Sequence, residues 1–146
     1  MFAALYGQQI EMNGSILGFP ELHVFELLAI EEVDVQAPFA YLRSMEDPDI
    51  GFLVADPFSF YSDYQINLAD QDKEMLAATK STEITVFAIV TIAEPFAQST
   101  LNLLAPILVH VKNRKGIQIV LPPDSPYSTR MPLPVSQPTE EGGVSC

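Results

Sequence analysis

Residues 83–92 of this 146-residue chain read EITVFAIVTI, the most regular pattern in the sequence. The even positions from Ile84 to Ile92 are all apolar, and the odd positions from Thr85 to Thr91 combine threonine with phenylalanine and isoleucine. Successive side chains of a β-strand point to opposite faces of its sheet. The pattern therefore predicts a strand with both faces at least partly covered.

Shorter strand-like segments lie on both sides of this one, separated by turn signals. In one of them, Phe39, Tyr41 and Arg43 alternate with Ala40, Leu42 and Ser44. Further strands are predicted at residues 8–12, 24–30, 50–55, 107–111 and 117–121. Asn13-Gly14 predicts a tight hairpin turn, and residues 113–116 predict a second hairpin with Gly116 in the left-handed conformation.

One short helix is predicted, with Asp70 as its cap and residues 73–79 as its body. The whole pattern predicts a mainly β fold: a small, antiparallel, β-barrel-like single domain with one short helix. We expect this domain to span residues 1–134. Residues 135–146, rich in proline, glutamate and glycine, are expected to form a flexible tail.

The net charge of −12 limits the kinds of partner. Residues 1–75 hold 14 acidic side chains and only two basic ones, so they carry all of the net charge. Direct nucleic-acid binding is not expected, because it requires lysine and arginine to neutralise phosphates. An anionic membrane surface is disfavoured for the same reason. If the carboxylates gather on one part of the exterior, a basic protein surface is the expected partner.

The sequence contains a single cysteine, Cys146, which fits a cytoplasmic location. The N-terminal residues lack the positive charge of a signal peptide, and the longest apolar run is too short to span a bilayer. No cofactor motif, metal-ligand cluster or catalytic pair is found, so a non-enzymatic protein is expected. His23 and His110 are interpreted as strand residues. Glu46 and Asp47 lie close to Asp49, which makes a raised carboxyl pKa conceivable, although an exposed acidic turn is the commoner outcome.

Five motifs in the right order, covering about residues 16–133, resemble the flagellar assembly factor FliW family. The matching segments are Ile16–Leu22 with Gly-Phe-Pro, Pro38–Asp47, Phe52–Phe58 followed by Tyr64, Asn102–Ile107 with Ala-Pro-Ile, and Tyr127–Leu133. Arg43, His110 and Met131 depart from the residues expected in the family.

The resemblance implies a small, mostly antiparallel, β-barrel-like domain that switches between two partners. FliW proteins bind flagellin and also CsrA, a small basic RNA-binding regulator, and thereby relieve CsrA repression of flagellin mRNA translation. The chain itself is expected to be a monomer when free. Two alternatives are a flagellin chaperone without a translational role and a small hydrolase, which would need a metal or a polar pocket.

Eight residues are candidates for partner contact: Phe19, Glu46, Asp47, Asp49, Asp56, Phe58, Tyr64 and Asn102. A structural role is favoured for Gly18-Phe19-Pro20, as a turn with an inserted aromatic ring. Phe58 and Tyr64 are equally compatible with core packing and with anchoring a partner. Asn102 is compatible with bridging a turn or with exposure, and Arg130 is expected to form an internal ion pair.

Overall fold

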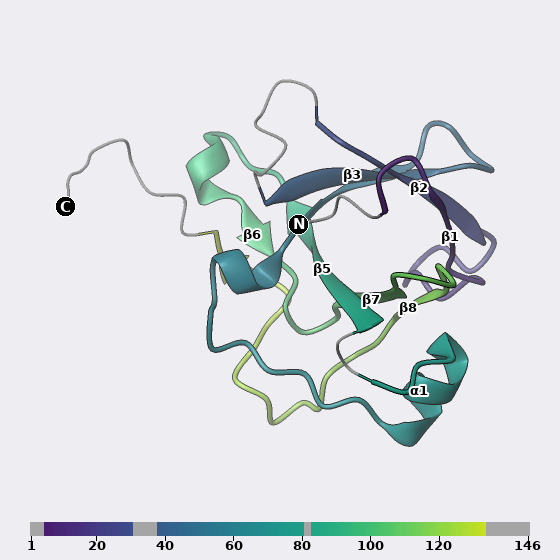
Figure 1. Cartoon of the computed structure of the whole chain (residues 1–146). Coiled ribbons are helices and arrows are strands. Elements are labelled where there is room, and N and C mark those ends of the chain that lie inside the picture. Colours follow the sequence, from purple (N-terminus) through teal and green to yellow (C-terminus); the bar gives the residue numbers. More distant parts are fainter. Residues whose placement is uncertain (1–4, 31–37, 81–82, 134–146) are drawn as a thin grey trace.

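The computed structural model describes residues 5–30, 38–80 and 83–133 (Figure 1). Their strands are β1 (Gln9–Glu11), β2 (Val24–Leu28), β3 (Phe39–Ser44), β4 (Gly51–Ala55), β5 (Ile84–Thr91), β6 (Thr100–Leu101), β7 (Ile107–His110), β8 (Gly116–Gln118) and β9 (Met131–Pro132). One α-helix, α1 (Asp70–Leu76), and two 3₁₀ turns, η2 (Pro57–Ser59) and η4 (Phe96–Gln98), complete these described residues. The predicted tail, residues 135–146, lies outside them.

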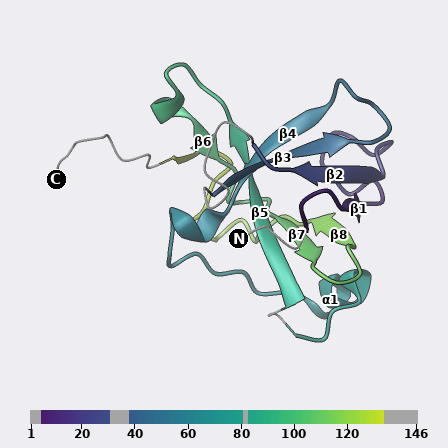
Figure 2. The same ribbon diagram turned by 45° about the horizontal axis from the view of Figure 1, so that its top comes forward.

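The nine strands form one antiparallel sheet with a branch at β5. Its main path runs β1-β2-β3-β4-β5-β6-β9, and β7 pairs with both β5 and β8. Figure 2 shows β5 as the long central strand, which pairs with β4, β6 and β7. A parallel bridge from Glu11 to Lys115 brings β1 beside the start of β8 without a continuous ladder. The sheet is curved and not closed, and the predicted mainly antiparallel β fold with one short helix is confirmed.

β5 separates two hydrophobic clusters because its neighbouring side chains point to opposite faces. Phe87 belongs to the first cluster, with Phe25, Leu42 and Val54. Ala88 belongs to the second, whose buried members are Ala55, Tyr64, Val90, Leu101, Leu103, Leu121 and Leu133. The prediction that both faces of residues 83–92 are covered is therefore confirmed.

The predicted alternation in β3 is also confirmed. Ala40, Leu42 and Ser44 are buried, whereas Tyr41 and Arg43 are exposed. Arg43 pairs across the strands with Glu26, and its Nη2 lies 3.0 Å from Glu26 Oε1. Arg43, which departs from the residue expected in the family that the sequence resembles, thus forms an ion pair on the surface. Such an ion pair contributes little to stability.

Two turn predictions are wrong in detail. Asn13 and Gly14 both have positive φ angles, of 51° and 75°, but β1 and β2 are joined by the long segment 12–23 and not by a two-residue hairpin. β7 and β8 do form the predicted hairpin, yet Arg114 takes the left-handed conformation, with φ of 62°. Gly116 lies in β8, where a Cβ atom would approach Met12 Sδ to 2.5 Å. A glycine is therefore favoured at position 116 by close packing against Met12 and not by a positive φ angle.

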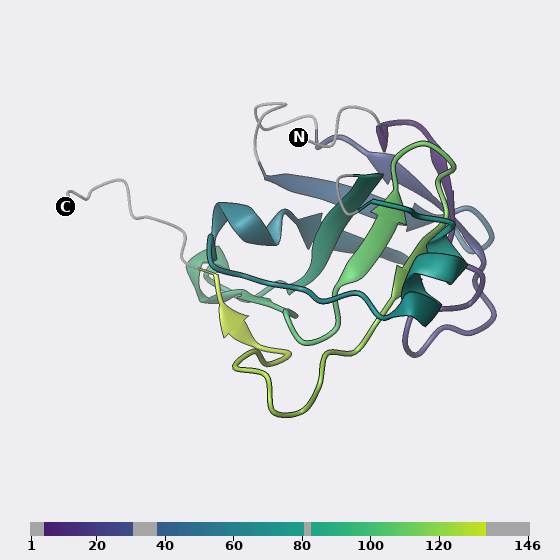
Figure 3. The ribbon, with the colours of Figure 1, turned by 60° about the horizontal axis from the view of Figure 1, so that its bottom comes forward.

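The predicted helix exists but is shifted. Ala69, not Asp70, is the N-cap residue, and the Asp72 carboxylate accepts a hydrogen bond of 3.3 Å from the Ala69 N–H. The helix ends before residue 79, because Ala77 adopts a left-handed conformation with φ of 55°. Figure 3 shows the preceding segment running along one side of the molecule from η2 to α1.

Candidate functional site

Three candidate residues lie in the turn between β3 and β4, which we name the acidic turn: Glu46, Asp47 and Asp49. Ser44 Oγ accepts hydrogen bonds from the backbone N–H groups of Glu46 (3.1 Å) and Asp47 (3.0 Å). Asp47 Oδ1 accepts one from the Asp49 N–H at 3.1 Å. Glu46 and Asp49 are exposed and Asp47 is partly buried. The turn is therefore held by side-chain oxygens of Ser44 and Asp47 that accept bonds from its backbone, and Glu46 and Asp49 remain exposed.

Glu46 also ties the acidic turn to the segment before β2. Its Oε1 accepts hydrogen bonds from the backbone N–H of His23 (2.5 Å) and of Val24 (3.1 Å). These bonds, led by the one from His23, lower the pKa of the Glu46 carboxyl because they favour its charged form. The raised pKa considered for this group is therefore wrong for Glu46. His23 itself is exposed and precedes β2.

A second group of candidates surrounds η2. Asp56 is buried and acts as the N-cap of this turn, accepting hydrogen bonds from Phe58 N–H (3.3 Å) and Ser59 Oγ–H (2.8 Å). Phe58 is 41% exposed, and its ring centroid lies 5.7 Å from that of Tyr64. Phe58 is therefore the exposed member of this group and Asp56 is the residue that fixes its backbone.

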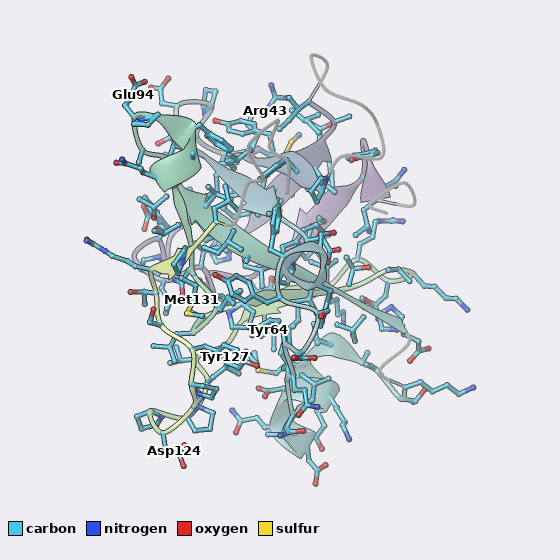
Figure 4. The ribbon with its side chains drawn as sticks, turned by 90° about the vertical axis from the view of Figure 1, so that its left-hand side faces the viewer. Arg43, Tyr64, Glu94, Asp124, Tyr127 and Met131 are labelled. Carbon is cyan, nitrogen blue, oxygen red and sulfur yellow. The ribbon has the colours of Figure 1, made fainter. Side chains whose placement is uncertain are left out.

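Tyr64 lies in the second hydrophobic cluster, where its hydroxyl donates a 2.6 Å hydrogen bond to Leu103 O. Its ring meets Tyr127 edge-on, with centroids 4.7 Å apart, and Figure 4 shows the two side chains together, well away from Arg43. Burial, and then the proximity of Tyr127, raise the Tyr64 pKa far above its usual value. Tyr64 thus packs the core, and its predicted contact with a partner stays a prediction.

Phe19 and Asn102 also have defined structural contacts. The Phe19 ring meets Phe52 edge-on at 5.6 Å and packs against the first cluster. Asn102 Oδ1 accepts a 3.0 Å hydrogen bond from Ala105 N–H and so bridges a turn. Neither contact tests a role in partner binding.

His110 is the buried histidine of β7. Its Nδ1 accepts hydrogen bonds from the backbone N–H of Lys112 (3.1 Å) and Asn113 (3.3 Å), which leaves Nε2 to carry the proton. Nε2 faces Glu83 Oε2 at 3.7 Å. This arrangement fixes the β7–β8 turn.

Arg130 makes no ion pair with a described residue. The prediction of an internal ion pair for Arg130 is therefore wrong for the part of the chain that the structure covers.

The acidic side chains of the first half are spread over several parts of the fold. Two groups are the acidic turn and the segment of Asp63 together with Asp70, Asp72 and Glu74 of α1. The other described ones lie outside both groups: Glu11, Glu21, Glu26 and Asp56. Figures 1 and 2 show the β3–β4 turn and α1 well apart. The carboxylates described by the structure therefore do not gather in one patch.

Among the residues that the structure describes, no set of three or more His, Cys, Asp or Glu side chains is placed to hold a metal ion, and no helix has the length and apolarity needed to cross a membrane.

An apolar groove was not predicted from the sequence. It has a volume of about 290 Å³, and we name it the β5 groove; its lining residues are Phe58, Ile66, Leu68, Ile84, Val86 and Leu108. They come from four separate parts of the chain, and only Phe58 was a candidate. Sequence patterns identified Ile84 and Val86 as one strand face but carried no signal for what covers that face.

The fold and these surfaces define a class of protein: a small antiparallel β protein with exposed carboxylates, with Phe58 exposed next to an apolar groove, and without a metal-ligand cluster among the described residues. The family described as FliW protein matches residues 5–133. The chain therefore belongs to the FliW family of flagellar assembly factors. That description names a role in assembly and not a catalysed reaction.

Individual relatives agree with this membership. A flagellar assembly factor FliW from Shouchella clausii is 40% identical over 124 residues, which cover 85% of this chain and 82% of the relative. The FliW of Bacillus subtilis is 37% identical over 139 residues, covering 95% and 89% of the two chains. A crystal structure of the flagellar assembly factor FliW superimposes with a TM-score of 0.78 at 35% identity, covering 86% of this chain and 84% of that one.

Proposed function

We propose that this chain is a non-enzymatic, cytoplasmic assembly factor that binds flagellin and, alternatively, a CsrA-type RNA-binding regulator. When it holds the regulator, flagellin mRNA is translated; when flagellin accumulates and occupies the chain, the released regulator represses translation. The observation that carries this proposal is membership of the FliW family over residues 5–133.

The carboxylates do not gather in one patch, so the support for a basic partner comes from the net charge of −12 and from the exposed acidic turn. Asp47 and Asp49 present carboxylates on a turn that is braced by Ser44 and Glu46, so little backbone ordering is needed on binding. One ion pair at about 4 Å contributes roughly 1 kcal/mol in water and about 4 kcal/mol near a protein surface. The same negative field disfavours RNA phosphates near a bound regulator, so the chain need not cover the RNA site. Salt weakens such an association.

Competition tests the partner switch directly. A purified regulator complex is titrated with flagellin, and release of the regulator is followed by size-exclusion chromatography or fluorescence anisotropy. We expect release in proportion to the flagellin added. A chain that binds flagellin but never the regulator, even at low salt, would instead be a chaperone without a translational role.

The two acidic regions provide matched variants for locating the regulator contact. We expect Asp47→Asn with Asp49→Asn to weaken regulator binding by about tenfold at low salt and to reduce its salt dependence, because two exposed charges are lost. The control pair, Asp70→Asn with Asp72→Asn, removes the same charge from α1. Equal losses from both pairs would show that the regulator responds to net charge and not to the acidic turn.

A further inference from the structure

The N-terminal half of β5 has one edge that no described strand covers. β4 pairs with β5 only at Ala88 and Ile89, and its chain then leaves the sheet at Asp56 and Pro57. β7 occupies the other edge, from Ile84 to Phe87. Figure 2 shows β7 and β8 along one edge of the lower part of β5, and draws no strand of the described chain along the opposite edge.

The hydrogen-bond pattern shows which backbone groups face this open edge. Val111 N–H donates to Glu83 O at 3.0 Å, so the backbone groups of Glu83, Thr85 and Phe87 point toward β7. Those of Ile84 and Val86 then point away from β7, and no hydrogen bond from another described residue reaches them. The N–H and C=O groups of Ile84 and Val86 therefore have no partner among the described residues along this edge, and η2 is the described element that lies next to it.

The β5 groove lies over the face of the sheet beside this edge, because Leu108 of β7 lines it together with Ile84 and Val86 of β5. Ile84 and Val86 form one wall, and Ile66 and Leu68 form another. Residues 65–69 alternate between exposed and half-buried in the manner of a strand, yet within the described chain residues 65–68 make no backbone hydrogen bond. Apolar space therefore adjoins unpaired backbone groups, which is the combination used when a sheet binds an extended peptide.

We propose that the β5 groove binds an extended peptide segment that adds a strand to the edge of β5 at Ile84–Val86. The apolar walls favour a peptide in which every second side chain is apolar, because every second residue of a strand points to the same face. The surrounding charge favours basic flanks, since carboxylates outnumber cations on the adjoining segments: Asp63, Asp70, Asp72, Glu74 and Glu83 against Lys73, Lys80 and Lys112. A second copy of this chain, with a charge of −12, is disfavoured by the same field.

Synthetic peptides test this site without either of the partners proposed above, so its failure leaves the partner switch untouched. The probe is a fluorescent nine-residue peptide library with arginine at both ends and Val, Leu, Ile or Phe alternating with Thr or Ser. One control library carries glutamate at the ends, and another carries backbone N-methyl groups that remove its donors while keeping its side chains. We expect the basic peptides to bind, and both controls to bind about tenfold more weakly.

Val86→Asp places a charge in the groove, and we expect it to weaken peptide binding by about tenfold. Its matched control is Ile92→Asp, since Ile92 is 61% exposed just beyond the other end of β5. Amide hydrogen exchange on the unaltered chain provides a readout that does not depend on the variant folding. We expect the amides of Ile84 and Val86 to become protected when peptide is added.

Several results would overturn the proposal: no peptide of the library binding at about 1 mM, N-methylated peptides binding equally well, or unchanged exchange at Ile84 and Val86. Equal losses from Val86→Asp and Ile92→Asp would also overturn it. A concentration-dependent dimer that Val86→Asp abolishes, without any peptide binding, would assign the edge to a second copy of the chain.

Discussion

Three of the polar side chains that the sequence indicates as candidates for partner contact also bond to the protein's own backbone. Asp56 caps η2, the Tyr64 hydroxyl bonds to Leu103 O, and Asn102 bonds to Ala105 N–H. Such bonds satisfy backbone groups that would otherwise be costly to bury. By contrast, the Asp49 carboxylate accepts no hydrogen bond from any residue that the structure describes. Free acceptor capacity therefore distinguishes Asp49 from these three positions.

Glu46 provides a prediction about acid stability. Its folded-state pKa is lowered from the usual value of 4.5 by the His23 and Val24 N–H groups. The stabilisation is therefore complete above pH 4.5 and is lost as the pH falls through the lower folded-state pKa. We expect Glu46→Gln to unfold at lower urea concentration than the unaltered chain at neutral pH, with the gap narrowing in acid.

Urea unfolding followed by circular dichroism from neutral to acid pH measures this effect. Asp49→Asn is the control, because it removes a charge from the same turn without touching the His23 and Val24 bonds. A gap that stays constant with pH for Glu46→Gln would show that the ionised carboxylate does not brace the turn.

At the level of elements, regular strands were predictable and their connections were less so. The alternation in β3 identified both of its faces, because one side of that strand is buried and the other is exposed. Asn13-Gly14 showed the right backbone conformation but not the long connection that contains it. Gly116 was assigned to a turn because glycine tolerates positive φ, although its lack of a Cβ serves contact with Met12. A local pattern cannot distinguish these two uses of glycine.

The end of α1 gives a second prediction. Ala77 has φ of 55°, a left-handed conformation that L-residues with a Cβ adopt at a cost and glycine adopts freely. We expect Ala77→Gly to stabilise the protein by about 0.5–1 kcal/mol, the relieved strain being partly offset by the greater freedom of glycine in the unfolded chain. Thermal and urea unfolding measure the change. The neighbouring Ala78→Gly should destabilise, and a loss of stability in both variants would contradict the strain argument.

At the scale of the whole molecule, the two larger hydrophobic clusters share strands β4 and β5, and a smaller third cluster, Leu76, Leu108 and Ile117, also packs against β5. Val54 and Phe87 belong to the first cluster, while their neighbours Ala55 and Ala88 belong to the second. Unfolding of β4 and β5 would expose the apolar side chains of both clusters at once. We therefore expect a single cooperative unfolding transition.

Truncation in each cluster tests this coupling. Leu42→Ala in the first and Leu101→Ala in the second remove fully buried side chains, and each should cost about 2–5 kcal/mol. Tyrosine fluorescence, which includes Tyr64 of the second cluster, and circular dichroism should then shift together in both variants. Separate transitions for the two probes would show that the clusters unfold independently.

The candidate site was predictable only where it is local in sequence. The acidic turn follows from Glu46, Asp47 and Asp49 being close neighbours in the chain. The β5 groove depends on where β4 leaves the sheet and on how residues 65–69 cross β5, and neither is encoded in a short window. The distribution of charge was likewise not readable, because the fold separates the acidic turn from α1.

The sharing of β5 also restricts how such a chain can change length. Losing or gaining one residue within β5 would invert the orientation of every later side chain in it, and would exchange the two sets that Phe87 and Ala88 represent. The connection at residues 12–23 has no such alternation to invert, but its Met12, Ile16 and Leu22 are buried in the first cluster. Insertions and deletions among descendants of this sequence should therefore accumulate at the exposed positions of connections and spare the central strand.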